Sequence, residues 1–166
     1  YNIFKPFGIF NSFRSNLRFN YEQLYMPNTY VGARFGGNIN AQFKNFWWTG
    51  FGFNFRPFDN YNYFEPREPG YYWKTSGDFN FNVFLSTDDR KKFSVGGFTG
   101  MWHRPEDGAM AVFGGIGPMY RVSNRFSINY DFNVDKIMNG KGFVTKLYDE
   151  NDELQDIIFG LRFQNT

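Results

Sequence analysis

The sequence lacks cysteine, has a single histidine and contains no long run of apolar residues. Without cysteine there are no disulfides and no thiolate metal site. Because His103 is alone, a histidine metal cluster or a catalytic triad within this chain is excluded. No segment approaches the ~20 apolar residues that a membrane-spanning helix needs. If the chain crosses a membrane, it must therefore do so with strands.

Charge is not concentrated anywhere along the chain. The 18 basic and 16 acidic residues are scattered and give a net charge of +2. Binding to a nucleic-acid backbone usually needs a concentrated basic face, which the sequence does not show. Basic residues interleaved with aromatic ones leave a single-strand-binding sheet open as a minor alternative. We expect no nucleic-acid partner.

Aromatic residues are abundant, with 24 Phe, 11 Tyr and 4 Trp among 166 residues. The mean hydropathy is nevertheless −0.55, because Asn, Arg, Asp, Gly and Ser fill most other positions. The chain is thus rich in both apolar and polar residues. The period with which they alternate along the sequence is therefore the main evidence for its secondary structure.

The dominant pattern has a period of two, which is typical of β-strands. Alternation predicts strands at about 13–22, 31–44, 50–56, 78–86 and 126–135, with less regular, Gly-rich strands at about 92–102 and 110–121. In the second of these, apolar or small residues occupy the odd positions and polar or small residues the even ones: Val31, Ala33, Phe35, Gly37, Ile39, Ala41 and Phe43 against Gly32, Arg34, Gly36, Asn38, Asn40, Gln42 and Lys44.

We predict an all-β fold, an antiparallel up-and-down transmembrane β-barrel with about seven to nine strands in this chain. A soluble sandwich also alternates apolar and polar positions. The predicted strands of ~9–13 residues exceed the five or six usual in soluble sheets, and the polar face is rich in Asn, Arg and Asp. We expect that face to line a hydrated interior through Arg18, Asn20, Arg34, Asn38, Asn40, Asn54, Arg56, Asn80, Asn82, Asn129, Asp131 and Asn133.

The predicted connections alternate in length. Short turns around 45–47, 87–91 and 122–125 are separated by longer stretches at 23–30, 58–75, 103–109 and 135–166. Outer-membrane barrels carry turns at one rim and loops at the other, so we interpret about 58–75 and 135–166 as long extracellular loops. Aromatic residues at the strand ends fit girdles at the membrane surfaces, with Trp47, Trp48 and Tyr120 at the short-turn rim.

The stretch 61–72, YNYFEPREPGYY, is the most distinctive in the chain. An aromatic loop with flanking carboxylates could stack on sugar rings or plug a pore, and it could also be a stiff, salt-bridged loop folded onto the barrel mouth. We favour the structural interpretation. The candidate interaction residues are Phe64, Glu65, Arg67, Tyr71, Tyr72 and Trp73.

No group of residues points to an enzyme. The acidic run at 149–156 lacks the ligand spacing of a calcium loop, and no helix follows the glycines at 114–117 as a phosphate-binding loop requires. A glycosidase needs two carboxylates at a defined separation, which a sequence cannot show. We expect no catalytic residue, no cofactor and no bound metal, and we expect His103 to lie in a solvated loop.

Five stretches of the sequence carry a resemblance to a known family. They are LRFNYEQLYMPN (17–28), FKNFWWTGFGFNFRPFDNYNYFEPREPG (43–70), STDDRKKFSVGG (86–97), RVSNRFSINYDF (121–132) and DIIFG (156–160). In this order the chain resembles envelope proteins, chiefly of Bacteroidota, that join an N-terminal carbohydrate-binding-family-nine-like domain to a C-terminal β-barrel domain of unknown function. Where a second Arg is expected after DIIFG, this chain has Leu161.

The resemblance implies that this chain is an internal piece of the barrel of a longer protein, and the tail 156–166 does not end on the aromatic residue that commonly closes such barrels. It also implies that 141–163 is one extracellular hairpin, whereas the alternation would count two further strands there. The resemblance supplies no catalytic residues.

Three functions are considered. We expect the chain to lie in the bacterial outer membrane, in contact with the lipid bilayer, as an anchor or as a subunit of an assembly with other envelope proteins. The alternative is a pore or transporter for glycans or other small solutes. An enzyme is the third, and the absence of a catalytic constellation argues against it.

Overall fold

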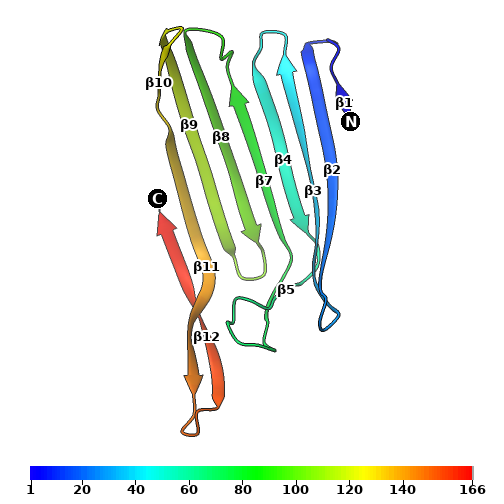
Figure 1. Cartoon of the computed structure of the whole chain (residues 1–166), viewed down its shortest axis with the longest axis vertical. Coiled ribbons are helices and arrows are strands. Elements are labelled where there is room, and N and C mark those ends of the chain that lie inside the picture. Colours follow the sequence, from blue (N-terminus) through cyan, green and yellow to red (C-terminus); the bar gives the residue numbers. More distant parts are fainter. Residues whose placement is uncertain (166) are drawn as a thin grey trace.

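The computed structural model describes residues 1–165, and most of them form one antiparallel β-sheet (Figure 1). Four strands are short: β1 (Asn2–Ile3), β5 (Asn60–Asn62), β6 (Trp73–Thr75) and β10 (Phe126–Asn129). Eight are long: β2 (Phe10–Leu24), β3 (Thr29–Phe43), β4 (Trp48–Arg56), β7 (Asp78–Ser86), β8 (Phe93–Arg104), β9 (Ala109–Ser123), β11 (Phe132–Tyr148) and β12 (Leu154–Asn165).

The ten-stranded sheet follows the order of the chain, β1-β2-β3-β4-β7-β8-β9-β11-β12, with β10 also paired to β9. The strands β5 and β6 form a separate two-stranded sheet inside the connection between β4 and β7. The predicted strand 126–135 is interrupted, because β10 ends at Asn129 and β11 begins at Phe132. The other predicted strands lie on β2, β3, β4, β7, β8 and β9.

The prediction of an all-β antiparallel sheet of many strands is confirmed. Within residues 1–165, the short β1 and the long β12 lie at opposite edges of the sheet, and neither β1 nor β2 pairs with β12 (Figure 1). The described part of the chain is therefore an open sheet. In the same range, no helix is long and apolar enough to cross a membrane.

The register aligns the apolar positions of neighbouring strands on one side of the sheet. Leu17, Gly37, Phe53, Phe81 and Met101 are successive partners across β2, β3, β4, β7 and β8. Because side chains alternate between faces, the whole apolar set lies together. We call this side the Phe-rich face, carried by Leu17, Phe19, Phe35, Ile39, Phe51, Phe55, Phe81, Val83, Leu85, Val112, Ile116, Ile128, Phe132 and Val134.

The Phe-rich face is not covered by any other described part of the chain. All fourteen of these side chains are exposed, from 38% for Phe81 to 83% for Leu17. The buried apolar residues among those described are few and small: Ala33, Ala41 and Ala109 in or beside the strands, and Pro66 in the connection 57–77. A soluble domain of this size buries large side chains between two layers. This sheet is instead a single layer without such a core.

The connections are more uniform in length than predicted. Strands β2 and β8 continue through the predicted long stretches 23–30 and 103–109, so that only residues 25–28 and 105–108 remain as turns. The expected contrast between the two rims is thus wrong at these two places. At both places the paired strands continue up to a four-residue turn. The long connection at this end of the sheet is 57–77, which contains β5 and β6.

The C-terminal part of the chain is a hairpin of two long strands. From Lys136 to Tyr148, β11 pairs with β12, with irregularities at three places. Beyond Met138, β11 has no partner on its β9 side, so the end of the hairpin extends past the sheet (Figure 1). The region 135–166 therefore consists mainly of paired strands, and Thr166 lies outside the described residues.

Candidate functional site

The side of the sheet opposite the Phe-rich face carries all twelve residues predicted to line a hydrated interior. We call it the Asn-rich face. One row of register partners across it is Asn16, Asn38, Gly52 and Asn82, and another joins Asn54 to Asn80. The twelve residues share this face: Arg18, Asn20, Arg34, Asn38, Asn40, Asn54, Arg56, Asn80, Asn82, Asn129, Asp131 and Asn133.

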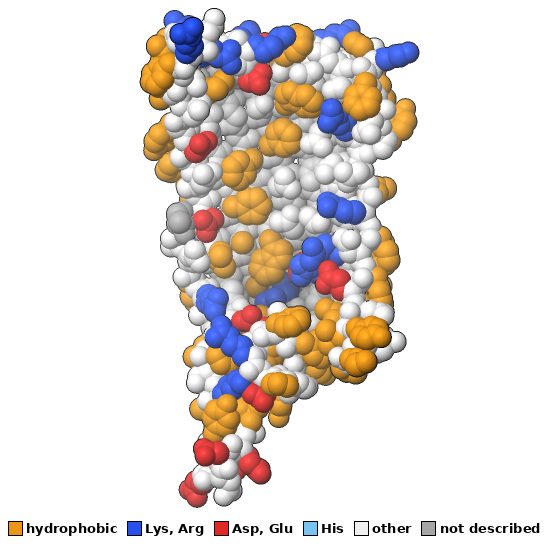
Figure 2. All heavy atoms as spheres, viewed as in Figure 1, with side chains coloured by type: hydrophobic (Ala, Val, Ile, Leu, Met, Phe, Trp, Pro, Cys, Tyr) orange, Lys and Arg blue, Asp and Glu red, His pale blue; other side chains and the backbone are white. Residues whose placement is uncertain are grey.

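Figure 2 shows the Asn-rich face towards the viewer. Uncharged polar side chains and backbone cover most of it, basic side chains gather at its upper end, and apolar side chains form patches in its middle. The apolar patches were not predicted, because the alternation assigned the aromatic residues to the other face.

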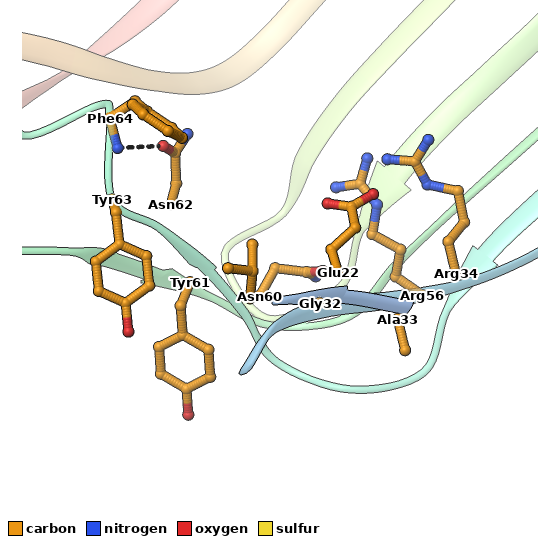
Figure 3. A pocket seen from close by; sticks show the side chains of 11 residues that line it. Glu22, Gly32, Ala33, Arg34, Arg56, Asn60, Tyr61, Asn62, Tyr63 and Phe64 are labelled. Carbon is orange, nitrogen blue, oxygen red and sulfur yellow. Dashed lines mark hydrogen bonds between the residues drawn. The ribbon is translucent and has the colours of Figure 1, made fainter. Parts of the chain in front are cut away.

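Two arginines and a glutamate meet at the loop end of this face. Arg56 forms an ion pair of 3.1 Å with Asp78, whose exposed fraction is only 6%. Arg34 is half-buried, and within residues 1–165 its Nε atom has no hydrogen-bond partner. In Figure 3, Arg34, Arg56 and Glu22 rise on the same side of their strands.

These three side chains line a cavity of about 270 Å³ together with the residues of β5. Asn60 closes it against β3, since a Cβ added to Gly32 would lie 2.6 Å from the Asn60 Oδ1 atom. Tyr61 and Tyr63 point to the opposite side (Figure 3). The cavity thus offers two guanidinium groups, a carboxylate and amide groups, which suits a small polar ligand.

Four aromatic side chains also lie on the Asn-rich face, where sequence reasoning did not place them. Phe84 and Phe98 are register partners on β7 and β8, and Trp102 and Phe113 follow on β8 and β9. The sequence does carry a signal for them, because each of these rings occupies a position of its strand that belongs to the polar face in the neighbouring strands. Phe84 falls among Asp78, Asn80, Asn82 and Ser86 on β7.

The connection 57–77 reaches across the sheet to the hairpin of β11 and β12. The backbone N–H of Phe143 donates to Glu65 Oε1 at 2.9 Å, and Lys146 Nζ lies 2.5 Å from Glu68. Arg67 stands 4.6 Å over the Phe143 ring. These contacts join residues nearly eighty positions apart, and they agree with the interpretation of 61–72 as a stiff, salt-bridged loop.

The remaining loop candidates differ in their contacts. Trp73 stacks on Phe159 with ring centroids 5.1 Å apart, whereas Phe64 is 81% exposed. Tyr72 packs edge-on against Tyr61 at 5.2 Å, and Tyr71 is about half exposed. Trp73 is therefore part of the contact with the hairpin, and Phe64 and Tyr71 remain accessible.

The predicted girdle residues do not all share one face. Tyr120 pairs with Phe93 and Ile128 on the Phe-rich face. Trp47 lies in the turn before β4, beside an apolar hollow on that same face. Trp48, however, pairs with Gln42 and Ser86, which places it in the register of the Asn-rich face.

The acidic residues of the loops are held by hydrogen bonds and ion pairs. Asp107 receives two hydrogen bonds from Arg104 and lies 3.2 Å from Lys141, and the Arg104 guanidinium holds the pKa of Asp107 well below its usual range. Asp149 accepts bonds from the backbone of Asn151 and Glu153, which lower its pKa. Within residues 1–165, no three His, Asp or Glu residues are grouped to hold a metal ion.

His103 does not lie in a loop as predicted. It is in β8, half-buried, and its ring meets the Phe79 ring edge-on at 5.6 Å. Its Nδ1 atom lies 3.1 Å from the carbonyl oxygen of Ala109. The strand continues to Arg104, so this histidine is a member of the sheet.

Comparison with known proteins gives a match to one family. No curated protein and no solved structure matches the chain. The family described as a domain of unknown function, DUF5916, matches residues 1–166. The match covers the strands, the long connection and the C-terminal hairpin alike. The chain belongs to the DUF5916 family.

Proposed function

We propose that this chain forms part of the wall of a bacterial outer-membrane β-barrel, with its Phe-rich face against lipid and its Asn-rich face towards a water-filled interior. The observation that carries the proposal is the exposure of large apolar side chains along one complete face. Leu17 is 83% exposed, Ile116 53% and Phe132 52%. Water would make this arrangement unfavourable, since burying one such side chain contributes about 1.5–3 kcal/mol.

The dimensions of the sheet support a membrane location. The strands β4 and β7 have nine residues each, and β2, β3 and β9 have fifteen. A tilted strand needs about 9–11 residues to cross the hydrocarbon layer. The exposed apolar face also spans many strands, whereas soluble monomers rarely expose apolar patches larger than a few hundred Å². Hydrocarbon is the covering that suits a face of this extent.

A sheet in lipid cannot keep open edges, because each unpaired backbone group there costs several kcal/mol. In the described residues, the one strand partner of β12 is β11, and the outer side of β2 is met by the short N-terminal segment that contains β1. The proposal therefore includes further strands beside β2 and β12. They come from the rest of the same polypeptide or from a partner in an envelope assembly.

In this role the chain anchors what is attached to it. The resemblance of its motifs to proteins with a carbohydrate-binding-like domain makes such a domain the first candidate for display at the cell envelope. A pore or transporter is the second candidate function. It is favoured by the Asn-rich face, which combines amide groups, both signs of charge and partly exposed aromatic rings.

The absence of cysteine allows a direct test with single introduced thiols. The variants Phe81→Cys and Val83→Cys place the thiol on the Phe-rich face of β7, and Asn80→Cys and Asn82→Cys place it on the other. A fluorophore at the first pair is expected to be quenched by nitroxide lipids. The second pair is expected to react with a water-soluble maleimide.

Equal reaction of all four thiols with the water-soluble reagent, in protein that stays folded without detergent, would overturn the proposal. Quenching by lipid at all four positions would also overturn the assignment of faces. The four positions are adjacent on one strand, so differences in local folding do not explain an alternating result.

A further inference from the structure

The rings on the Asn-rich face are gathered in one place. Phe84 and Phe98 pair across β7 and β8 in one row of the register, Phe113 lies in the next row on β9, and Trp102 in the row after that on β8. Adjacent rows on one face are about 6.8 Å apart, so the four rings follow each other along the strands. The centroids of Phe98 and Phe113 are 6.5 Å apart.

Glycines make room for three of these rings to lie along the sheet. A Cβ added to Gly100 would lie 2.6 Å from the Phe113 ring, and one added to Gly115 would lie 2.8 Å from the Phe98 ring. The edge of the Phe84 ring occupies the same position over Gly50. Each ring therefore lies over the backbone of a neighbouring strand. Phe98 is 44% exposed, Phe84 and Phe113 are half-buried, and the planes of the Phe98 and Phe113 rings are tilted by 44°.

The row of rings continues to the loop end of the sheet. The Arg104 guanidinium stands 5.5 Å from the ring of Trp102 and also 5.5 Å from that of Trp73. Trp73 in turn stacks on Phe159 of β12. Aromatic groups thus extend from the middle of the Asn-rich face to the contact between the long connection and the hairpin.

Hydrogen-bonding groups accompany the rings on both sides. On one side Asn82 pairs with Gly100, and Asn40 lies against Gly50. On the other side Asn133 lies against Gly115, and Asp135 pairs with Phe113. Charges of both signs lie farther out on the same face, with Arg18 on β2 at one side, Asp131 at the other, and Arg56 ion-paired with Asp78. The surroundings of the rings therefore favour no ligand of high charge.

We infer that this row of rings is a binding track for a neutral, linear oligosaccharide. Sugar rings have apolar C–H faces that stack on aromatic rings and an edge of hydroxyl groups that needs amide and carboxylate partners, and this surface supplies both. The inference rests on the proposed function, because the track faces the interior only if the Phe-rich face lies in lipid.

Two other occupants fit the surface less well. Single-stranded nucleic acid also stacks on aromatic rings, but Asp131 and Asp135 would repel its phosphates at one side of the track. An apolar protein segment filling the interior would need apolar neighbours for its own side chains, and Asn82 and Asn133 would lose water without gaining partners.

The test is binding of hexasaccharides to the purified protein in a detergent without sugar headgroups. Hexamers of glucose, xylose, mannose and galactose are titrated separately by calorimetry, with polyethylene glycol of equal length as a control. At least one hexamer is expected to bind. Loss of a single stacked ring, as in Phe98→Ala or Trp102→Ala, is expected to weaken binding about two- to tenfold.

Matched variants separate stacking from a general loss of fold. Phe81→Ala removes a ring from the other face of β7 and is expected to leave binding unchanged, and Phe98→Tyr keeps the ring and is expected to retain it. Binding by none of the hexamers, or equal loss in the Phe81 and Phe98 variants, would overturn the inference. So would tighter binding of oligothymidylate that depends on the same rings.

The thiol-labelling pattern of β7 is measured on the same preparation. An alternating pattern without oligosaccharide binding would refute the track and leave the membrane wall intact. A pattern that does not alternate would refute the wall itself. The two failures are therefore distinguishable.

Discussion

The substitution Val83→Arg separates a lipid-facing sheet from a water-facing one by its effect on stability. Val83 lies near the middle of β7 on the Phe-rich face, between Phe51 and Thr99 of the neighbouring strands. It is 42% exposed, so it is not part of a closed core whose packing an arginine would destroy. The change in stability then depends on whether the introduced arginine is surrounded by water or by lipid.

The two environments predict different magnitudes. In water, a substitution at so exposed a position changes the free energy of unfolding by no more than about 0.5 kcal/mol. At the centre of a bilayer, an arginine on the lipid face of a barrel costs about 2–4 kcal/mol. We expect the larger cost, which shifts the folding equilibrium in vesicles by about 30- to 1000-fold.

The assay is reversible unfolding by guanidinium in lipid vesicles, followed by tryptophan fluorescence. The control is Asn82→Arg, one residue away and on the Asn-rich face, where the guanidinium meets water and the cost is expected to stay below about 0.5 kcal/mol. If the two variants unfold at the same denaturant concentration, the assignment of lipid and water to the two faces is wrong.

Three further predictions concern the loops and the rings. Trp73→Ala should speed proteolysis of the 57–77 connection about two- to tenfold, because it loses its stack on β12, whereas the exposed Phe64→Ala should not. Gly100→Ala should lower the free energy of unfolding by about 1–3 kcal/mol, because the new Cβ would lie 2.6 Å from the backbone oxygen of Phe81 and 2.6 Å from the Phe113 ring. Gly96→Ala, whose Cβ would make only an ordinary 3.4 Å contact, is its control. Hydrogen bonds from Arg90 hold the pKa of Asp88 at about 2, below the usual 3.8. Asp88→Asn should therefore lower the free energy of unfolding at pH 7. The difference in stability between the variant and the parent should disappear as the pH falls from about 3.8 through 2.

The sheet could be predicted from the sequence because the side-chain period of a strand is fixed by backbone geometry. Where one face is uniformly apolar, as in β3 and β4, the alternation locates the strand and assigns its faces together. The twelve polar residues then fall on one side without any knowledge of the register. The order of strands follows because short connections favour antiparallel neighbours.

The lengths of the connections could not be predicted in the same way. The stretches 23–30 and 103–109 contain Pro, Asn and Gly, which are typical of turns, but also Tyr30, His103 and Arg104, which pair within strands. Whether such a residue joins a ladder depends on the neighbouring strand, and that is not a local property. The contact of Glu68 with Lys146 likewise depends on two segments that the sequence keeps far apart.

The irregular alternation of β8 and β9 has a physical cause that is part of the candidate site. Gly100, Gly115 and the rings of Phe98, Trp102 and Phe113 occur on the face that is polar elsewhere, and Gly97 and Gly114 interrupt the apolar face, so neither face of these two strands follows the alternation cleanly. A glycine in a central strand sacrifices packing and backbone entropy, and an aromatic ring towards water forgoes burial. When a ring packs over a glycine of the neighbouring strand, it covers backbone that the glycine leaves exposed, and the ring itself becomes partly buried. The pairing therefore offsets part of the cost of both residues. The fold alone would be satisfied by Gly and Asn at these positions, as it is by Gly36, Asn38, Gly52 and Asn54 on β3 and β4. The inferred oligosaccharide track gives these rings a role that the fold does not require, and a weak alternation between two strongly alternating regions is the sequence signal for such a surface.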